Sequence, residues 1–347
     1  MSKSLSKSVI YGERALIESI RRRVQSSSSA LRLGIGDDCA ILRPEPEEEI
    51  VVTTDFSLES VHFRRDWHSP ESVGHRCLAR GLSDLAAMGA RPLAAFLSLA
   101  VPSEFATVSK GKKSWIERFL DGLFALARHC KVPLAGGDSA QSPQLACFDI
   151  VLIGAVPQSR ALLRSTARPG DLIYVTGALG GAAAELLAVE RAPRRFAKLT
   201  AASGDHPHLF PQPRLAAAAK LAAARLAHSA IDISDSLSTD LAHICDESRL
   251  AAELDAASIP IHPLASKAVR TRRPPSALDL ALHGGEDYEL LFTASPRAKI
   301  PKRIAGVPIH RIGRMLPRRP GQPQVTLRDH EGSTSTLTPR GWEHFRS

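Results

Sequence analysis

Residues 168–187 read RPGDLIYVTGALGGAAAELL, and this stretch decides the expected fold. RPGD is typical of a turn, the apolar run after it predicts a short strand, and the glycine-rich step before the alanines predicts a tight turn into a helix. Strands and helices alternate on both sides of it, which indicates two α/β or α+β domains. Composition shifts near residues 157–170, so we expect domains at 1–158 and 159–347.

Upstream of that stretch, hydrophobic spacing predicts further helices and strands. IVVTTDF (50–56) and FDIVLIGAV (148–156) are typical of strands. A helix is expected to begin at Ser69–Pro70, because serine can cap a helix and proline fits its first position, and to stop at Gly89 and Pro92. Two more helices are expected, over 115–129 and from residue 13 until the serine tract 26–29.

Downstream of that stretch, the same alternation continues. Helices are expected over 215–227 and 237–245, and strands over 231–234, 290–294 and 307–315. SKAVRTRRPPS (266–276) is basic and contains proline, so it is interpreted as a loop. The second half of the chain therefore predicts a mixed α and β domain of its own.

The composition is that of an ordinary globular protein. Of the 347 residues, 44% are hydrophobic and 23% charged, which excludes a disordered chain, a collagen-like fibre and a coiled coil. The formal net charge is +9 at pH 7. A basic chain suits an anionic ligand without identifying it.

Cysteine usage and hydropathy bear on the compartment. The five cysteines are odd in number and none forms a CxxC pair, so a disulfide framework or a structural zinc site is not expected. No secretory signal and no apolar run long enough for a membrane helix are visible; the Ala-rich run over 215–227 is interrupted by Lys220 and Arg225. We expect a cytoplasmic protein that does not span a membrane.

Carboxylates recur beside glycines or at strand ends. They lie in GIGDDCA (34–40), TTD (53–55), LSDLAAMGA (82–90), GGD (136–138), DISD (232–235) and GGEDYEL (284–290). One aspartate in such a place is usually a turn or cap residue, but six such segments are harder to explain as turns and caps alone. Magnesium prefers oxygen ligands together with phosphates, and clustered carboxylates repel unless cations neutralise them. The pattern predicts a polyphosphate site with several Mg²⁺ ions.

Glycine turns and isolated histidines are less specific. TGALGG (176–181) is either an anion site at a helix start or only a tight turn. The P-loop pattern and the protein-kinase motifs are absent. His62 stands alone, and His206 and His208 have no acidic or cysteine neighbour, so they are interpreted as structural residues. Trp342 is either a hydrophobic anchor or an aromatic lid for a flat ligand ring.

The chain resembles the thiamine-monophosphate kinase family, a branch of the aminoimidazole ribonucleotide synthetase and selenophosphate synthetase superfamily. Eight motifs occur in the family's order, namely GIGDDCA, TTD, VHF, LSDLAAMGA, GGD, RPGD-x-IYVTG, IDISD and GGEDYELLFT. They run from about Gly12 to Trp342. The resemblance implies a two-domain aminoimidazole ribonucleotide synthetase-like fold: an N-terminal domain that pairs across a homodimer and a C-terminal α+β domain that closes the active site.

The activity that this resemblance implies is ATP-dependent phosphorylation of thiamine monophosphate to thiamine diphosphate, the last step in making that cofactor. The γ-phosphoryl group passes directly and in line, with several Mg²⁺ ions, so no protein side chain is expected as a covalent catalyst. Such a reaction needs positioning and charge neutralisation more than a strong base.

The resemblance also implies three sets of site residues. The metal positions are Asp38, Thr53, Thr54, Asp55, Asp84, Asp138, Asp232 and Asp235. The nucleotide positions are Gly137, Asp138, Arg164 and Ser234. The thiamine positions are His62, Glu286 and Trp342. A carboxylate and an aromatic ring suit a flat cationic thiazolium, and an arginine fork suits phosphate oxygens.

Two features depart from the family pattern. The family usually reads DISDGL, whereas this chain has Ser236 in place of the glycine. Serine is a good helix cap, so an extended backbone tolerates it, whereas a positive φ would strain it. The predicted helix around Leu120 also offers no tyrosine to stack on adenine.

Other functions fit less well. Selenophosphate synthesis needs a reactive cysteine before the glycine-rich segment, but the first cysteine is Cys39. The hydrogenase-maturation relative ends in a cysteine-bearing tail, whereas the last cysteine here is Cys245. Aminoimidazole ribonucleotide synthetase stays open, although GGEDYEL and RGWEHF favour the thiamine branch. Arginine pairs motivate a nucleic-acid binder, but no aromatics interleave with them, so no nucleic-acid partner is expected.

Overall fold

The computed structural model describes residues 9–10, 12–24, 29–108, 112–268 and 275–341. The chain divides into two compact units. Unit 1 comprises residues 1–82, 92–155 and 192–205, and unit 2 comprises residues 83–91, 156–191 and 206–347. Trp342, most of the serine tract and the centre of the basic loop lie outside the described residues.

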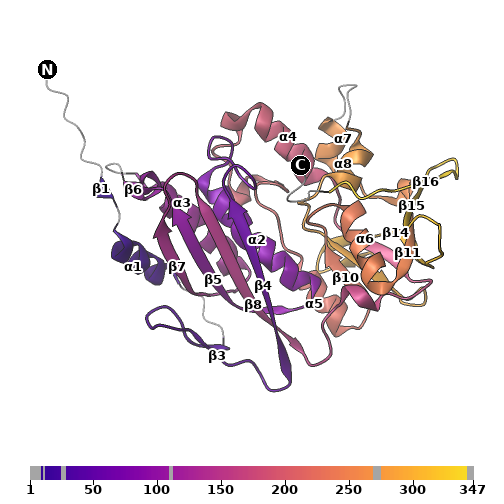
Figure 1. The fold of residues 1–347 in the computed structure, drawn as a ribbon, viewed down its shortest axis with the longest axis horizontal. Coiled ribbons are helices and arrows are strands. Elements are labelled where there is room, and N and C mark those ends of the chain that lie inside the picture. The colour runs from indigo at the N-terminus through magenta and orange to yellow at the C-terminus, as the bar shows by residue number, and fades with distance from the viewer. Residues whose placement is uncertain (1–8, 11, 25–28, 109–111, 269–274, 342–347) are drawn as a thin grey trace. The chain divides into compact units, whose positions relative to one another are not determined.

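Unit 1 is built on a four-stranded sheet in the order β4-β8-β5-β7 (Figure 1). Its strands are β4 (Glu48–Leu58), β8 (Cys147–Pro157), β5 (Arg91–Val101) and β7 (Leu134–Gln141). The helices α2 (Pro70–Ala87) and α3 (Trp115–His129) bury their apolar sides on this sheet. Along β4 the burial alternates, which leaves the other side of that strand open to solvent.

Helices α2 and α3 touch through glycines. A Cβ on Gly74 would lie 1.9 Å from the carbonyl oxygen of Phe119, and one on Gly122 would lie 1.9 Å from that of Glu71. The backbones of the two helices therefore meet without side chains between them. Ser114 starts α3 with a capping box that it shares with Glu117, as expected for a serine three residues before a glutamate.

Unit 2 is built on a larger sheet with the order β10-β12-β9-β14-β11-β15-β16, and β13 pairs with β14. Its strands are β9 (Leu172–Thr176), β10 (Ser229–Asp232), β11 (Leu250–Asp255), β12 (Leu290–Ala294), β13 (Arg303–Ile304), β14 (Val307–Pro317), β15 (Val325–Arg328) and β16 (Thr334–Thr336). Ile173 packs in one core with α6 (Leu237–Ser248) and α8 (Ala277–His283), and the adjacent Tyr174 packs in another with α5 (Leu215–Ala223). Helices therefore cover both faces of this sheet.

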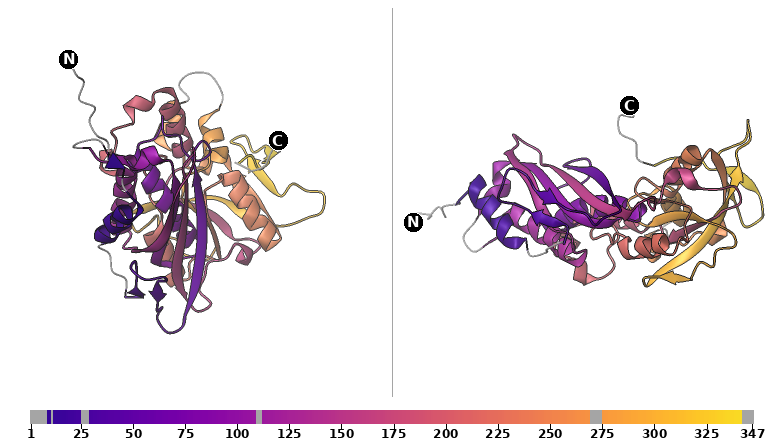
Figure 2. Two further views of the ribbon diagram at one scale, coloured as in Figure 1. Left: turned by 60° about the vertical axis from the view of Figure 1, so that its left-hand side comes forward. Right: turned by 90° about the horizontal axis from the view of Figure 1, so that it is seen from below.

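The remaining elements are short. They are β1 (Val9–Ile10), α1 (Glu13–Arg23), β2 (Leu31–Leu33), β3 (Ile41–Leu42), η1 (Ser103–Ala106), β6 (Thr107–Val108), η2 (Arg164–Thr166), α4 (Gly181–Arg191), η3 (Pro193–Arg195), η4 (Ala201–Ser203), η5 (Ala256–Ser258) and α7 (Pro263–Ala268). Figure 2 shows the same elements from two further directions. Among the helices that the structure describes, none is long and apolar enough to cross a membrane.

Most of the predicted elements are present. The helix over 115–129 and the strand over 290–294 have the predicted bounds, and the helix that begins at Pro70 is α2. The prediction missed β5 and β7. It made α5 too long, because the chain turns after Ala223 and Arg225 adopts a positive φ of 50°. The first residues of the expected basic loop belong to α7 instead.

Candidate active site

A cavity of about 780 Å³ in unit 1 brings together two of the predicted metal positions. Asp38, from the GIGDD loop, and Asp138, on β7, both line it. The cavity is also lined by Gly136, Gly137, Cys39 and residues of α1. Two carboxylates and a glycine-rich strand at one cavity form a set of ligands that suits a cation carrying phosphate oxygens.

Gly137 has a structural reason to be glycine. Its φ is +150°, and a Cβ there would lie 1.9 Å from the carbonyl oxygen of Leu97 on β5. The close approach comes from the pairing of β7 with β5, in which Gly137 stands opposite Leu97. The glycine thus lets the edge strand β7 pair closely with β5 and places Asp138 at the cavity.

The TTD motif lies on β4, where successive side chains point to opposite faces of the sheet. Asp55 is half-buried, and its carboxylate lies 3.4 Å from the Arg80 guanidinium on α2. Thr53 shares its face. Thr54 points to the other face, where its hydroxyl donates to Asp149 at 2.6 Å. The side chain of Thr54 is therefore separated from those of Thr53 and Asp55.

The acidic positions of unit 1 form two groups. β4 and β7 are the two outer strands of their sheet, so Asp55 and Asp138 are separated by three strand spacings, roughly 14 Å. Magnesium–oxygen distances are only about 2.1 Å. One ion cannot contact both aspartates of a single chain, so the two groups would serve different ions.

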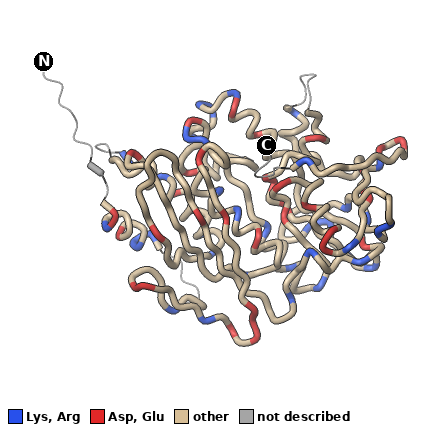
Figure 3. Tube along the Cα trace, viewed as in Figure 1, with Lys and Arg blue, Asp and Glu red and all other residues tan. Residues whose placement is uncertain are grey.

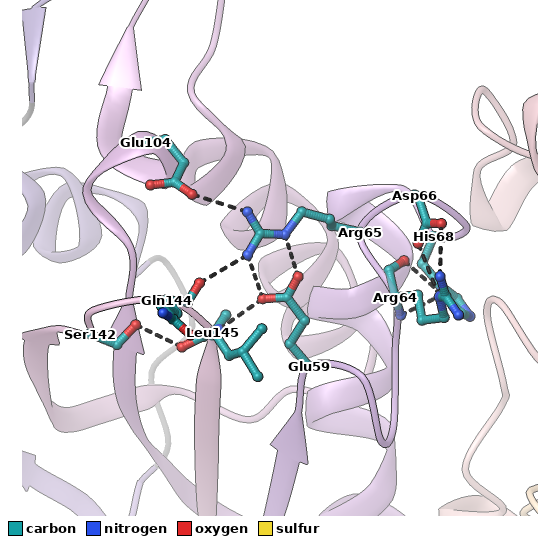
Figure 4. A network of polar contacts seen from close by, with 10 residues as sticks. Glu59, Arg64, Arg65, Asp66, His68, Glu104, Ser142, Gln144 and Leu145 are labelled. Atoms are coloured by element: carbon teal, nitrogen blue, oxygen red, sulfur yellow. Dashed lines mark hydrogen bonds and ion pairs between the residues drawn. The ribbon is translucent and has the colours of Figure 1, made fainter.

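The segment that carries His62 is held by a network of ionic contacts (Figure 4). Glu59, at the end of β4, is buried and pairs with Arg65, and it also accepts the N–H of Ala146 at 2.9 Å. Arg65 also pairs with Glu104 on η1, with 3.1 Å between its Nη1 and the carboxylate. The network joins three segments at this end of the sheet, and so fixes the loop from which His62 projects.

The ring of His62 has a defined tautomer. Its Nδ1 accepts the backbone N–H of Leu58 at 3.0 Å, so the neutral ring carries its proton on Nε2. Its carbonyl oxygen accepts from the buried Arg76 guanidinium at 3.0 Å. The half-buried imidazole therefore presents a donor in a fixed direction, which suits a phosphate or a polar edge of a substrate.

In unit 2, the IDISD segment gathers the remaining predicted ligands. Asp232 is buried at the end of β10 and accepts the hydroxyl of Ser83 at 2.7 Å. Asp84, next to Ser83 near the end of α2, is half-buried, so these two predicted positions lie in one region of unit 2. The carboxylate of Asp84 is close to the negative end of its helix, where a nearby cation would offset the unfavourable dipole.

A third acidic group surrounds the start of α6. Ligand atoms of Asp235, Asp240 and His243 lie within 4.8 Å of one another. Burial and the neighbouring Asp232 raise the pKa of Asp240 well above its usual value. Asp240 accepts the N–H groups of Asp235 and Ser236, at 3.2 and 3.0 Å, and so shapes the loop around them. Such a concentration of carboxylates is stabilised by bound cations.

Ser236 is accommodated at the position where the family usually has glycine. Its φ of 166° and ψ of 159° are extended, and its side chain accepts the N–H of Thr239 as the cap of α6. Of the two alternatives, the extended backbone with a capping serine is the one present, and the substitution introduces no positive φ. The cap also gives α6 a defined start next to Asp235.

The three carboxylates of GGEDYEL have different partners. Glu289 is buried and pairs with Arg214, whose Nε lies 2.7 Å from its carboxylate. Asp287 is buried and accepts the N–H groups of Gly180 and Ala182, at 2.7 and 3.1 Å. Glu286 alone keeps 28% of its side chain exposed. Of the three, Glu286 is thus the one that is accessible to a ligand.

The contacts of Asp287 decide between the two interpretations of TGALGG. This turn does bind an anion at the start of α4, but that anion is the chain's own carboxylate. Burial outweighs these hydrogen bonds and raises the pKa of Asp287 to about 7. The turn is therefore a junction between two segments of unit 2 and leaves these two amides unavailable to a phosphate.

His206 and His208 lie in a loop as predicted, but the expectation that they have no acidic partner was wrong. Nδ1 of His206 lies 2.6 Å from the buried carboxylate of Glu185 on α4. Nδ1 of His208 lies 3.1 Å from the carboxylate of Glu286. Sequence inspection missed both pairs because their members are distant along the chain and belong to no common motif.

Two of the predicted nucleotide positions, Arg164 and Ser234, lie at opposite ends of α6. Arg164 is exposed on η2, where its carbonyl oxygen accepts the hydroxyl of Ser248 at 2.7 Å. Ser248 ends α6, so the backbone of Arg164 lies at the end of that helix opposite Asp235, about 18 Å along it. Ser234 lies at the other end, where its carbonyl accepts the N–H of Glu286 at 2.7 Å. The predicted ring of Trp342 lies outside the described residues.

Comparisons with known proteins show the family of the chain. The N-terminal domain of AIR synthase related proteins matches residues 36–156, and the C-terminal domain of that family matches residues 168–323. The thiamine-monophosphate kinase of Escherichia coli strain K12 is 39% identical over 341 residues, which cover 96% of this chain and 98% of that protein.

Solved structures give the same result. The crystal structure of thiamine-monophosphate kinase from Stenotrophomonas maltophilia K279a is 36% identical, with a TM-score of 0.75 over 95% of this chain and 100% of that one. A structure of AaThiL complexed with AMPPCP and TMP is 27% identical, with a TM-score of 0.72 over 96% of this chain and 97% of that one. The match extends over both units.

Proposed function

Because the chain belongs to the thiamine-monophosphate kinase family, it transfers a phosphoryl group from ATP to thiamine monophosphate, and we propose that its aspartates hold Mg²⁺ ions for that transfer. The observation that carries the metal proposal is the meeting of Asp38 and Asp138 at one cavity. Bound Mg²⁺ neutralises charge on the phosphate oxygens and aligns donor and acceptor.

The available donors fit Mg²⁺ as a chemical class. Carboxylate and hydroxyl oxygens are hard ligands, and sulfur is absent from the proposed set. We assign Asp38 and Asp138 to one group and Thr53 and Asp55 to a second, with Thr54 contributing through its backbone. The unit 2 group consists of Asp84, Asp232 and Asp235. Several ions would neutralise an extended polyphosphate.

The proposed substrate contacts complete the assignment. Gly137, Asp138 and Ser234 would contact ATP, and the long side chain of Arg164 would reach toward the phosphates. His62 would donate from Nε2, and Glu286 would face the cationic thiazolium of thiamine monophosphate, with Trp342 as its aromatic partner. An anionic phosphate oxygen of thiamine monophosphate would bond to the γ-phosphorus while the bond from that phosphorus to the bridging oxygen breaks and ADP leaves, so a direct in-line transfer needs no protein base.

We also propose a cytoplasmic homodimer. The open side of β4 exposes apolar residues, with 64% of Val52 and 57% of Phe56 accessible in the single chain. Apolar side chains on an uncovered sheet face usually mark an interface, and a second copy presents the identical face. In this proposal residues 1–158 form the pairing domain and residues 159–347 form the domain that closes the site. The five cysteines are all free, which suits a reducing compartment.

The function is tested by incubating the purified chain with ATP, thiamine monophosphate and MgCl₂. We expect ADP and thiamine diphosphate in equal amounts, measured by liquid chromatography. Replacing thiamine monophosphate by thiamine, or adding EDTA, should abolish product formation. Equal turnover with thiamine, or no turnover with either acceptor, would contradict the proposal.

The metal assignment is tested by Asp55→Asn and Asp138→Asn. Each substitution keeps the shape of the side chain but removes a charge, so turnover should fall by at least about 100-fold and the Mg²⁺ dependence should shift to higher concentration. The matched control is Asp246→Asn, an exposed aspartate paired with Arg318, which should leave the kinetics unchanged. Wild-type turnover in either site variant would remove that residue from the metal site.

A further inference from the structure

The pair His208–Glu286 stands apart from the other ion pairs of unit 2, because its carboxylate is the accessible member of GGEDYEL. His208 is 2% exposed, whereas 28% of the Glu286 side chain reaches solvent. The two atoms lie 3.1 Å apart but off the axis of an aligned hydrogen bond, so the contact is a close polar approach that becomes an ion pair when the imidazole is protonated. A buried imidazole is thus in contact with a carboxylate that is partly exposed to solvent.

His208 is itself held in place. Its backbone N–H donates to the buried carboxylate of Glu185 at 2.9 Å, and the N–H of Leu209 donates to the same oxygen at 3.2 Å. The second oxygen of Glu185 lies 2.6 Å from Nδ1 of His206. Three contacts therefore anchor the 206–209 turn to α4, and the imidazole of His208 has little freedom to move away from Glu286.

Glu286 has an unusual backbone that needs such support. Its φ is +57°, Gly285 has +69° and Tyr288 has +50°, so two residues with side chains adopt the left-handed region within three positions. That region is unfavourable for residues other than glycine and persists where surrounding contacts enforce it. Here the N–H of Glu286 donates to Ser234 at 2.7 Å and that of Tyr288 to Ile233 at 2.9 Å.

From these contacts we propose that His208 is a positioning residue for thiamine monophosphate. Glu185 fixes His208, and His208 holds one oxygen of Glu286, which sets the plane of the carboxylate toward the thiazolium ring. The proposal rests on the assignment of Glu286 to the thiamine substrate. It assigns to this reaction a residue that lies outside every motif of the chain and that touches no reacting atom.

Steady-state kinetics of His208→Leu test the proposal, because leucine keeps the volume but loses the ring nitrogens. We expect KM for thiamine monophosphate to rise by about 10-fold or more, the size of a lost contact to a charged group, with KM for ATP within about twofold of wild type. His208→Asn keeps an N–H where Nδ1 stands and should recover most of the loss. Unchanged KM for thiamine monophosphate, or an equal rise for both substrates, would overturn the proposal.

A matched control separates positioning from general stability. His228 is another histidine of unit 2 that contacts a carboxylate: its Nδ1 lies 2.9 Å from the buried Asp171, at the start of β10 rather than at its Asp232 end. His228→Leu should lower Tm as His208→Leu does, but leave KM for thiamine monophosphate unchanged. A rise of that KM in His228→Leu equal to the rise in His208→Leu would count against a positioning role.

One measurement does not depend on turnover. In ligand-free protein, Glu286→Gln should shift the ring ¹⁵N resonances of His208 and leave those of His228 in place. An unmoved His208 signal would refute the pair itself. A moved signal together with a normal KM for thiamine monophosphate in Glu286→Gln would refute the substrate role of Glu286, while wild-type turnover tests the family activity separately.

Discussion

At the scale of single residues, Asp287 shows how strongly local surroundings can change a common side chain. Its carboxyl accepts hydrogen bonds from backbone N–H groups at the start of α4, yet burial raises its pKa to about 7 from an ordinary value of 3.8. Between about pH 4 and 7 the folded chain therefore keeps a proton that the unfolded chain has lost. By linkage, this group lowers the stability of the folded chain as pH rises through that window.

Asp287→Asn should remove this dependence, because an amide does not titrate. We expect the difference in Tm, wild type minus variant, to be larger at pH 5 than at pH 8, since only the wild type loses stability when Asp287 ionises. Thermal unfolding followed by circular dichroism at several pH values measures it. Parallel pH profiles for the two proteins would show that Asp287 titrates near its ordinary value.

At the scale of elements, the glycine contact between α2 and α3 reverses an ordinary expectation. Gly122→Ala inside a helix normally stabilises by about 1 kcal/mol. Here the new Cβ would meet the backbone of Glu71 at 1.9 Å, so the helices must separate. Overpacking typically costs about 1–3 kcal/mol and a backbone clash costs more, so packing outweighs propensity.

The expected result is a lower urea midpoint for Gly122→Ala. The control is Ala125→Gly on the exposed side of the same helix, which should cost about 1 kcal/mol through propensity alone. If Gly122→Ala were instead more stable than wild type, the two helices could not be in backbone contact.

Elements were predictable from the chain where local signals were complete. Hydrophobic spacing predicted the helix Trp115–His129, and a β-branched run predicted the core of β4. β5 was missed because RPLAAFLSLAV has a proline at its start and apolar residues in succession, without the alternation of a half-buried strand. β7 was missed because LAGGDSAQ has two glycines, which weaken the strand pattern in the sequence. Its pairing with β5, rather than its own side chains, stabilises it as a strand.

At the scale of the whole molecule, the open face of the unit 1 sheet predicts the assembly. Val52→Lys with Phe56→Lys places charges on that face, so the protein should run at 37.4 kDa, the mass of one chain, rather than at twice that mass. Light scattering during gel filtration measures it. The control is Leu163→Lys, an exposed apolar residue of unit 2 that should leave the dimer intact. A dimeric double variant, or a monomeric wild type, would place the interface elsewhere.

The candidate site was predictable by segment but not by role. The motifs identified where carboxylates occur, yet they could not distinguish the accessible Glu286 from Asp287 and Glu289, which tie unit 2 together. Those roles depend on partners such as His208 and Arg214, which stand in segments without any motif. Net charge was equally uninformative about the site, because basic and acidic residues are interspersed along the trace of both units (Figure 3).

The thiols described above make the chain suitable for spectroscopy. Burial raises the pKa of Cys77 and Cys245 to about 12 and that of Cys130 to about 11, and it also raises the pKa of the half-buried Cys147, so these sulfurs stay protonated and slow to alkylate. Cys39 is exposed and lines the cavity next to Asp38. A maleimide fluorophore would therefore attach there preferentially, and its emission would report occupation of the cavity in the otherwise unaltered chain.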